Sequence, residues 1–423
     1  MKRFIPALSL LLITLVSAAA GIPAENRVYD PELKSVQVFR EGSEMQLPVI
    51  TLGSDQSLTI RFDDLSPELK RFRYTILHCE SDWSLSSDLI PADYIDGFRE
   101  ENIETYRYSY NTTTRYTHYT ASFPTANMRP KLSGNYLLVV YDDDISHISF
   151  SCRFMVAEIT AVVAEGRVVQ PAAGASHFDR QQVDFVLNLG GFTINDVERE
   201  LRVVMMQNGR WDNALYLSRP RFTRPGQLDY RYDESITFPG GNQFRWFDTK
   251  SLQYQSERIA RISFDTAWQV LLLPDIPRPF KQYVSTDKDL NGWYFIKSED
   301  HADDSQIEAD YAWVHFFLAF PARLTTGSFH VAGELTGWRL DESNRMTFDP
   351  DRKGYSLSLL LKQGYYNYTY LLKTDDKTPA DESATEGSHW DTENDYHILV
   401  YYHATGAQYD RLISVNTINS LTP

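Results

Sequence analysis

The residues of this 423-residue chain with the most obvious chemical potential are adjacent, His78 and Cys79. An imidazole that activates a thiol is the nucleophilic pair of many cysteine-dependent enzymes. They stand at the end of a strand-like run, 74–78, which His78 ends and Cys79 follows. Neighbouring residues of a strand point to opposite faces of a sheet. We therefore expect no dyad here and assign no catalytic residue.

The sequence lacks the motifs of the common enzyme classes, such as Gly-x-Ser-x-Gly, His-Glu-x-x-His or a phosphate-binding glycine loop. Acidic pairs and triplets do occur, and each follows a strand-like run, which is typical of turns. These acidic runs are 63–64, 142–144 and 303–304. The sequence therefore predicts neither an enzyme nor a cofactor.

One segment, 287–292, has the opening pattern of a calcium-binding loop. Such a loop needs a bidentate acid at its twelfth position, where this chain has Ser298. Asn291-Gly292 between strand-like runs already predicts a type I′ turn. We favour the turn and predict no metal site.

The chain has two cysteines, Cys79 and Cys152, and each lies in a strand-like run. An exported protein can form a disulfide between them across a sandwich core. Spacing alone does not distinguish this pairing from two buried free thiols, so both interpretations stay open.

The first twenty residues have the pattern of a secretory signal peptide. Lys2 and Arg3 precede an apolar run, 4–16, and small residues lead to a cleavage site between Ala20 and Gly21. The run is shorter than the roughly 20 residues that span a bilayer. We expect a cleaved, exported chain with no membrane span of its own.

The composition excludes some partners and favours β-structure. The formal net charge of −16 disfavours nucleic acid and anionic lipid, which need basic clusters. Aromatic residues make up 13% of the chain, and Tyr and Phe favour strands. Short alternating runs separated by turn residues predict an all-β protein. One such turn is Asn208-Gly209, which predicts a hairpin.

These runs group into three expected β-sandwiches in series. The first is an immunoglobulin-like sandwich over 21–157, and the second covers 158–280. Pro274, Pro277 and Pro279 break the pattern and mark the next boundary, because proline cannot donate a ladder hydrogen bond. The third sandwich is expected over 281–423.

The third region resembles carbohydrate-binding modules of the glycogen-binding type. The resemblance rests on the glycines and aromatic residues of 331–338, 354–361 and 364–368. It implies a small β-sandwich in which Trp338 stacks on a sugar ring and Asn394 makes a polar sugar contact. This gives an alternative function, glycan binding in the periplasm.

A second resemblance covers the whole chain and follows long segments in order. These segments are 29–31, 76–83, 93–98, 132–137, 207–213, 238–248, 361–368 and 392–396. With them the chain resembles the plug proteins of the type IX secretion system of Bacteroidetes bacteria. The resemblance implies a periplasmic protein at the inner face of the outer membrane. There it would dock on the giant β-barrel translocon and close its pore when no cargo passes.

Three tryptophans are candidates for contact with that partner, because interfaces favour aromatic residues beside charge. They are Trp83, Trp211 and Trp246. The alternative for each is a place in a sandwich core.

Overall fold

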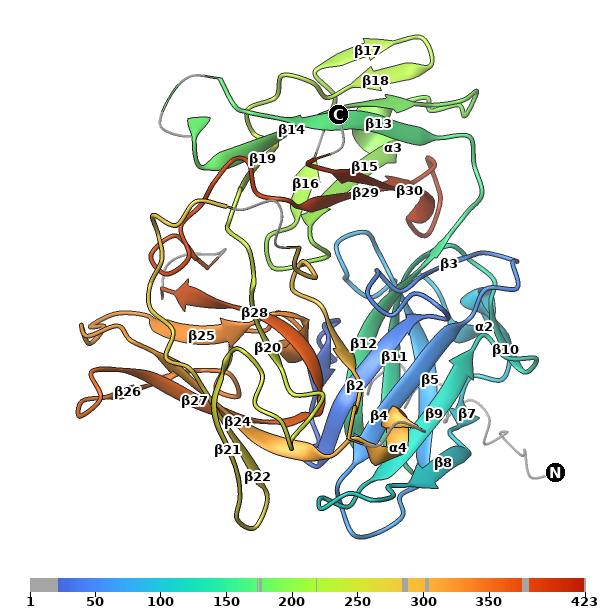
Figure 1. Cartoon of the computed structure of the whole chain (residues 1–423). Coiled ribbons are helices and arrows are strands. Elements are labelled where there is room, and N and C mark those ends of the chain that lie inside the picture. Colours follow the sequence, from blue (N-terminus) through green and yellow to red (C-terminus); the bar gives the residue numbers. More distant parts are fainter. Residues whose placement is uncertain are drawn as a thin grey trace, which may run out of the picture.

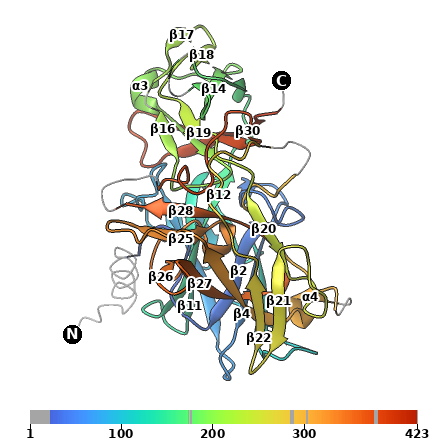
Figure 2. The ribbon, with the colours of Figure 1, turned by 60° about the vertical axis from the view of Figure 1, so that its left-hand side comes forward.

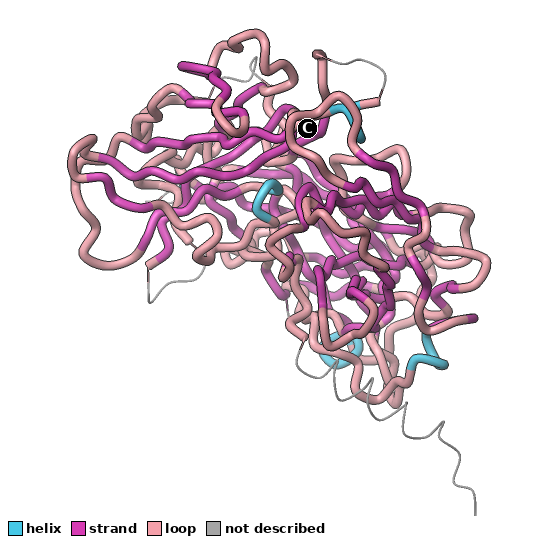
Figure 3. Tube along the Cα trace, turned by 90° about the horizontal axis from the view of Figure 1, so that it is seen from below, coloured by secondary structure: helices cyan, strands magenta, loops and turns pink. Residues whose placement is uncertain are grey.

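The structure is a computed structural model that describes residues 22–172, 174, 177–217, 219–283, 288–300, 304–374 and 380–421. The expected signal peptide and Asp287 lie outside the described residues. Strands dominate this part of the chain, and its helices are single short turns (Figure 3). Within the described ranges no helix is long and apolar enough to cross a membrane. The fold is all-β and consists of several sandwich modules, as the sequence predicted.

The first module is a sandwich of two sheets, coloured blue to cyan in Figure 1. One sheet contains β1 (Arg27–Val28), β12 (Ile148–Ala157), β11 (Gly134–Asp142), β5 (Phe72–Cys79) and β7 (Glu101–Asn102), with β3 (Val49–Thr51) beside β12. The facing sheet contains β2 (Leu33–Arg40), β4 (Leu58–Asp64), β9 (Thr117–Phe123) and β8 (Thr105–Tyr108). At the edge lie α2 (Pro91–Tyr94) and the pair of β6 (Ile95–Gly97) and β10 (Met128–Pro130).

The second module also has two sheets and lies above the other two in Figures 1 and 2. One sheet contains β13 (Val163–Val169), β14 (Arg180–Asn188), β18 (Gln227–Asp229) and β17 (Phe222–Arg224), with β19 (Thr237–Pro239) beside β14. The other contains β16 (Leu215–Leu217), β15 (Leu201–Gln207), β29 (Asp395–Tyr402) and β30 (Arg411–Asn419). The short α3 (Val197–Glu200) leads into β15.

The third module is the yellow and orange part of Figure 1. Its first sheet contains β20 (Arg245–Asp248), β28 (Gly364–Lys373) and β23 (Tyr294–Ile296), with β25 (Ser328–Ala332) also paired to β28. Its second sheet contains β21 (Ile259–Phe264), β22 (Trp268–Leu272), β24 (Tyr311–Leu318), β27 (Gly354–Lys362) and β26 (Thr347–Asp349). Two short helices complete it, α4 (Ser305–Glu308) and the 3₁₀ turn η2 (Glu334–Thr336).

Strand pairing corrects the expected domain boundaries. The sequence assigned all of 281–423 to the third sandwich, but residues 396–402 of β29 pair with the whole of β15 in the second module. The third module also starts before residue 281, because β20 pairs with β28 and β22 with β24. The third module is thus inserted between β19 and β29 of the second. Local alternation marks a strand but carries no information about its distant partner.

The first two modules form a stack of four sheets. Along β11, Tyr136, Leu138 and Val140 point into the first sandwich core, whereas Leu137, Val139 and Tyr141 pack against the second module. The facing strand β29 behaves in the same way, since Ile398 and Val400 enter its own core and Leu399 and Tyr401 face the first module. Both sheets are therefore buried on both faces, which explains their uninterrupted apolar runs.

Candidate functional site

His78 and Cys79 do not form a catalytic pair, in agreement with the expectation from strand geometry. The His78 ring lies in the first module, hydrogen-bonded to Ser86 Oγ at 2.8 Å and to the Ser133 carbonyl at 3.1 Å. Burial lowers its pKa to about 4. The Cys79 thiol points to the opposite face, towards the second module, and burial raises its pKa to about 12. A neutral imidazole and an un-ionised thiol on opposite faces cannot cooperate.

The disulfide interpretation is wrong, because Cys79 and Cys152 are both free. They lie on β5 and β12, which flank β11 on either side, opposite Asn135 and Leu138 respectively. Residues 135 and 138 face opposite sides of the sheet. The two thiols are thus two strands apart, about 9–10 Å across the sheet, are displaced by three residues along it and lie on different faces, which no disulfide can span.

The calcium-like segment forms a turn. Asn291 and Gly292 both have positive φ, 49° and 87°, as a type I′ turn requires. Asp289 accepts backbone hydrogen bonds from Asn291 at 2.8 Å and Phe244 at 2.7 Å. Its carboxylate therefore fixes the loop.

The junction of the first and third modules contains a buried ion pair. The Lys362 ammonium lies 2.6 Å from Oδ2 of Asp63, and both side chains are 1% exposed. His118 contacts the other oxygen at 2.6 Å, and the Tyr311 hydroxyl donates to Oδ2 at 2.6 Å. Burial alone would raise the pKa of Asp63, but Lys362 and His118 hold it below its usual value. Burial lowers the pKa of Lys362.

A loop of the first module adds a second contact to this junction. The carboxylate of Asp310 accepts hydrogen bonds from the backbone and hydroxyl of Thr113, both at 2.6 Å, and from the Thr114 backbone at 2.9 Å. Nearby, the Tyr116 hydroxyl donates to the Ala309 carbonyl at 2.8 Å. These bonds fix the position of the third module against the first.

Two of the candidate partner-contacting tryptophans lie between the first and second modules. Trp83 and Trp211 meet edge to face, with ring centroids 4.9 Å apart. The Arg153 guanidinium covers both rings, 4.5 and 5.2 Å from their centroids, and burial lowers its pKa to about 10. Trp83 is 5% exposed and belongs to the apolar cluster between the modules. The third candidate, Trp246, is half-buried and stacks on Tyr365.

The two residues proposed to contact a sugar lie in different modules. Trp338 follows η2 in the third module and is 7% exposed, because Arg210 of the second module covers its ring at 4.4 Å. Asn394 is buried in the second module, where it bonds to Asn208 at 2.7 Å and Gln181 at 2.9 Å. The Trp338 ring is not open to a sugar in this arrangement, and the geometry gives glycan binding no support.

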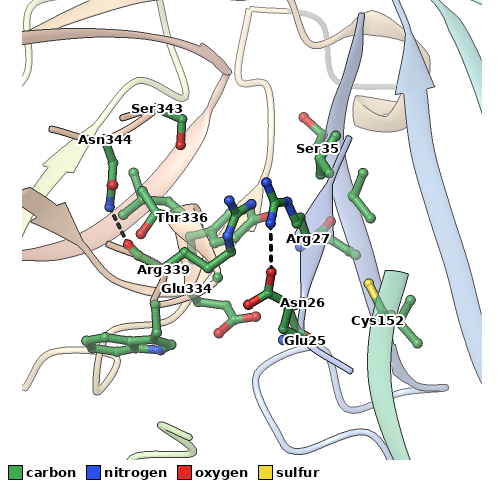
Figure 4. Close-up of a pocket in the computed structure, with 18 of the residues that line it drawn as sticks. Glu25, Asn26, Arg27, Ser35, Cys152, Glu334, Thr336, Arg339, Ser343 and Asn344 are labelled. Atoms are coloured by element: carbon green, nitrogen blue, oxygen red, sulfur yellow. Dashed lines mark hydrogen bonds and ion pairs between the residues drawn. The ribbon is translucent and has the colours of Figure 1, made fainter. Parts of the chain in front are cut away.

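A cleft of about 860 Å³ lies where the three modules meet. Figure 4 shows residues from the N-terminal segment, such as Arg27, facing η2 and Arg339 of the third module. Glu334 of η2 lines it, burial raises its pKa to about 7, and its carboxylate makes no hydrogen bond or ion pair within the described part of the chain. Sequence reasoning missed this cleft, since no local pattern connects segments from three modules.

Comparison with known proteins gives a family match and a similar solved structure. Residues 33–158 match the model described as the type 9 secretion system plug protein 1st domain. A crystal structure of a hypothetical protein from Parabacteroides merdae is 34% identical, with a TM-score of 0.90 over 94% of this chain and 100% of that one. No curated protein matches the sequence.

Two further solved structures resemble the chain only weakly. An alkylpurine DNA glycosylase of Pseudomonas fluorescens is 12% identical over 30% of each chain, with a TM-score of 0.17. The C-terminal domain of a Streptococcus agalactiae AgI/II polypeptide is 6% identical over 90% of this chain and 99% of that one, with a TM-score of 0.14.

Proposed function

Because the chain belongs to the family of type IX secretion system plug proteins, we propose that it closes the pore of that system's outer-membrane translocon from the periplasm. In this proposal it docks on the inner mouth of the giant β-barrel while no cargo passes. The observation that carries the proposal is the family match over the first module. The three modules also pack against one another, which suits a protein that blocks a pore by its bulk.

The module junctions support a role as a rigid stopper. A plug that holds back solutes must keep its shape and must not be pulled through the pore. Its domains should therefore not move independently of one another. Inter-domain motion is expected unless an interface is large and apolar. Here an apolar cluster joins the first two modules, and a buried ion-pair network centred on Asp63 joins the first to the third. The family and the all-β fold indicate a structural protein rather than an enzyme.

The docking surface is proposed to lie away from the three candidate tryptophans. Trp83 is buried and Trp211 packs against it, and both Trp211 and Trp246 are half-buried. The edge strand β8 has a more accessible aromatic group. Tyr106, Tyr108 and the following Tyr110 are 41%, 63% and 63% exposed. Tyrosine is enriched at interfaces, and an edge strand has free backbone groups for pairing.

The periplasmic location is part of the same proposal. It rests on the signal-peptide pattern of the first twenty residues and on the family to which the chain belongs. The translocon would then hold the protein at the inner face of the outer membrane through protein contacts.

Affinity purification from the native host tests the proposal. The tagged chain should retain a very large outer-membrane barrel protein, and deleting the plug should admit a normally excluded antibiotic only in cells that have the translocon. Recovery of no such barrel, or leakage independent of the translocon, would contradict the proposal.

A pair of variants tests the docking surface separately. Tyr108→Ala should reduce recovery of the barrel several-fold, whereas Tyr254→Ala, at an exposed tyrosine of the third module, should not. If both variants recover equal amounts of the barrel protein, the docking surface does not include β8. The pore-closing proposal would not be affected by that result.

A further inference from the structure

A histidine and two carboxylates meet where the first module touches the β29–β30 hairpin of the second. Glu80 directly follows β5, whereas His403 and Asp410 flank the hairpin loop. One ligand atom from each of these three residues lies within 4.8 Å of the other two. Residues 80 and 410 are far apart in sequence, so the fold creates this cluster.

Each of the three side chains is held in place by further contacts. Glu80 accepts hydrogen bonds from Ser86 Oγ and, at 2.8 Å, from the Asp410 backbone. Asp410 accepts from the Ser81 backbone at 2.9 Å through Oδ2, which leaves Oδ1 beside Nδ1 of His403, also at 2.9 Å. Such contacts are what orients the ligands of a metal site and restricts their rotation.

The charge of the cluster favours a cation. The carboxyl groups of Glu80 and Asp410 lie close together, and the Asp410 backbone donates to Glu80 Oε2 at 2.8 Å. The next residue, Arg411, does not neutralise the pair, because its guanidinium binds Glu158 at 2.6 and 2.9 Å. Two carboxylates therefore face a single imidazole at a partly buried position.

We propose that Glu80, His403 and Asp410 bind a Zn²⁺ ion. One nitrogen and two carboxylate oxygens are a donor set that Zn²⁺ accepts. Bonds of about 2.0–2.2 Å place tetrahedral ligands roughly 3.3–3.6 Å apart, which the ligand atoms, all within 4.8 Å of one another, can reach. The His403 side chain is 37% exposed, so water can take the fourth position and the ion can enter. The bound ion fastens the hairpin loop of the second module to the first. This inference does not depend on the pore-closing proposal.

Calorimetric titration of the chelator-stripped mature chain with zinc chloride at pH 7.5 tests the site. We expect one ion per chain and a melting temperature that rises with zinc, because a ligand that binds only the folded state stabilises it. His403→Gln should weaken binding at least about tenfold and remove the zinc-dependent shift in melting temperature. His147→Gln, at an exposed histidine of the first module, is the matched control and should bind like the unmodified chain.

Glu80→Gln provides a second variant of nearly unchanged shape if His403→Gln folds poorly, and circular dichroism without metal checks both folds. The inference is overturned if the folded mature chain releases no binding heat. It is also overturned if a folded Glu80 or His403 variant binds zinc as tightly as the His147 control.

Discussion

The ammonium of Lys362 in the third module lies 2.6 Å from the carboxylate of Asp63 in the first, with each side chain 1% exposed. These residues are 299 positions apart in the sequence. Removing one partner of such a pair leaves a buried charge without compensation, whereas the intact pair holds two modules in register.

Lys362→Met should therefore destabilise the chain by about 3–5 kcal/mol, measured as the free energy of unfolding in urea. Replacing both partners, as in Asp63→Leu with Lys362→Met, should recover part of this loss because no unpaired charge remains. Arg73→Met is the control, since its ion pair with Glu100 is exposed and should contribute less than about 1 kcal/mol. A loss as small as that of the control would show that the buried pair does not stabilise the junction.

Stability should fall as the pH drops from about 6.5 to 4, in part because of His78. Burial holds its folded-state pKa at about 4, below the usual 6.5, so between these values the unfolded chain binds more protons than the folded one. Its contribution is fully present above pH 6.5 and is lost as the pH falls, by about 3 kcal/mol in total. Urea unfolding across this range measures it.

His78→Gln should make the stability curve flatter in this pH window, and His147→Gln should leave it unchanged. An unchanged slope in a folded His78 variant would assign the acid sensitivity to other groups.

Trp83→Ala should destabilise the chain by about 3–5 kcal/mol, because it leaves a cavity beside Trp211 and removes a ring from under Arg153. Trp246→Ala, at a half-buried ring, should cost less. Thermal unfolding of both variants gives the comparison. If the Trp83→Ala variant is fully stable but no longer binds the translocon, Trp83 is a docking residue, and its proposed role in stabilising the module junction is wrong.

The two cysteines should remain unlinked in the exported protein. Alkylation in denaturant without reductant should modify both Cys79 and Cys152, and mass spectrometry should find two adducts per chain. Reductant should leave the melting temperature unchanged. A mass lower by two hydrogens, with neither thiol alkylated, would mean that the sheet can rearrange to join them.

Much of this structure follows from local patterns in the sequence. The alternation of apolar and polar residues predicted the strands. The rule that neighbouring strand residues point to opposite faces correctly predicted that His78 and Cys79 do not pair. The turn at Asn208-Gly209 is confirmed by its positive φ values of 53° and 72° and by the 3.0 Å bond from the Arg210 backbone to the Gln207 carbonyl, although the β15–β16 ladder begins only at Met205 and Leu215. These features depend on residues within a few positions of one another.

What the sequence did not reveal depends on distant partners. The run along β29 looked like the last strand of the third sandwich, yet its partner is β15. Trp338 has the sequence context of a sugar platform, but Arg210 from another module covers it. The Glu80–His403–Asp410 cluster likewise has no local motif, because its members come together only when the two modules dock.

The insertion of the third module also imposes an order on folding. A chain that emerges N-terminus first presents β15 long before β29, since Gln207 must wait for Tyr396, 189 residues later. Until β29 has been made, the edge of β15 that will pair with it stays open. An exposed apolar strand edge promotes aggregation. Only the completed chain can close that sheet and cover the outer face of the first module. A truncated or nicked chain would thus be a target for chaperones and proteases, so that partly made copies are removed before they can assemble.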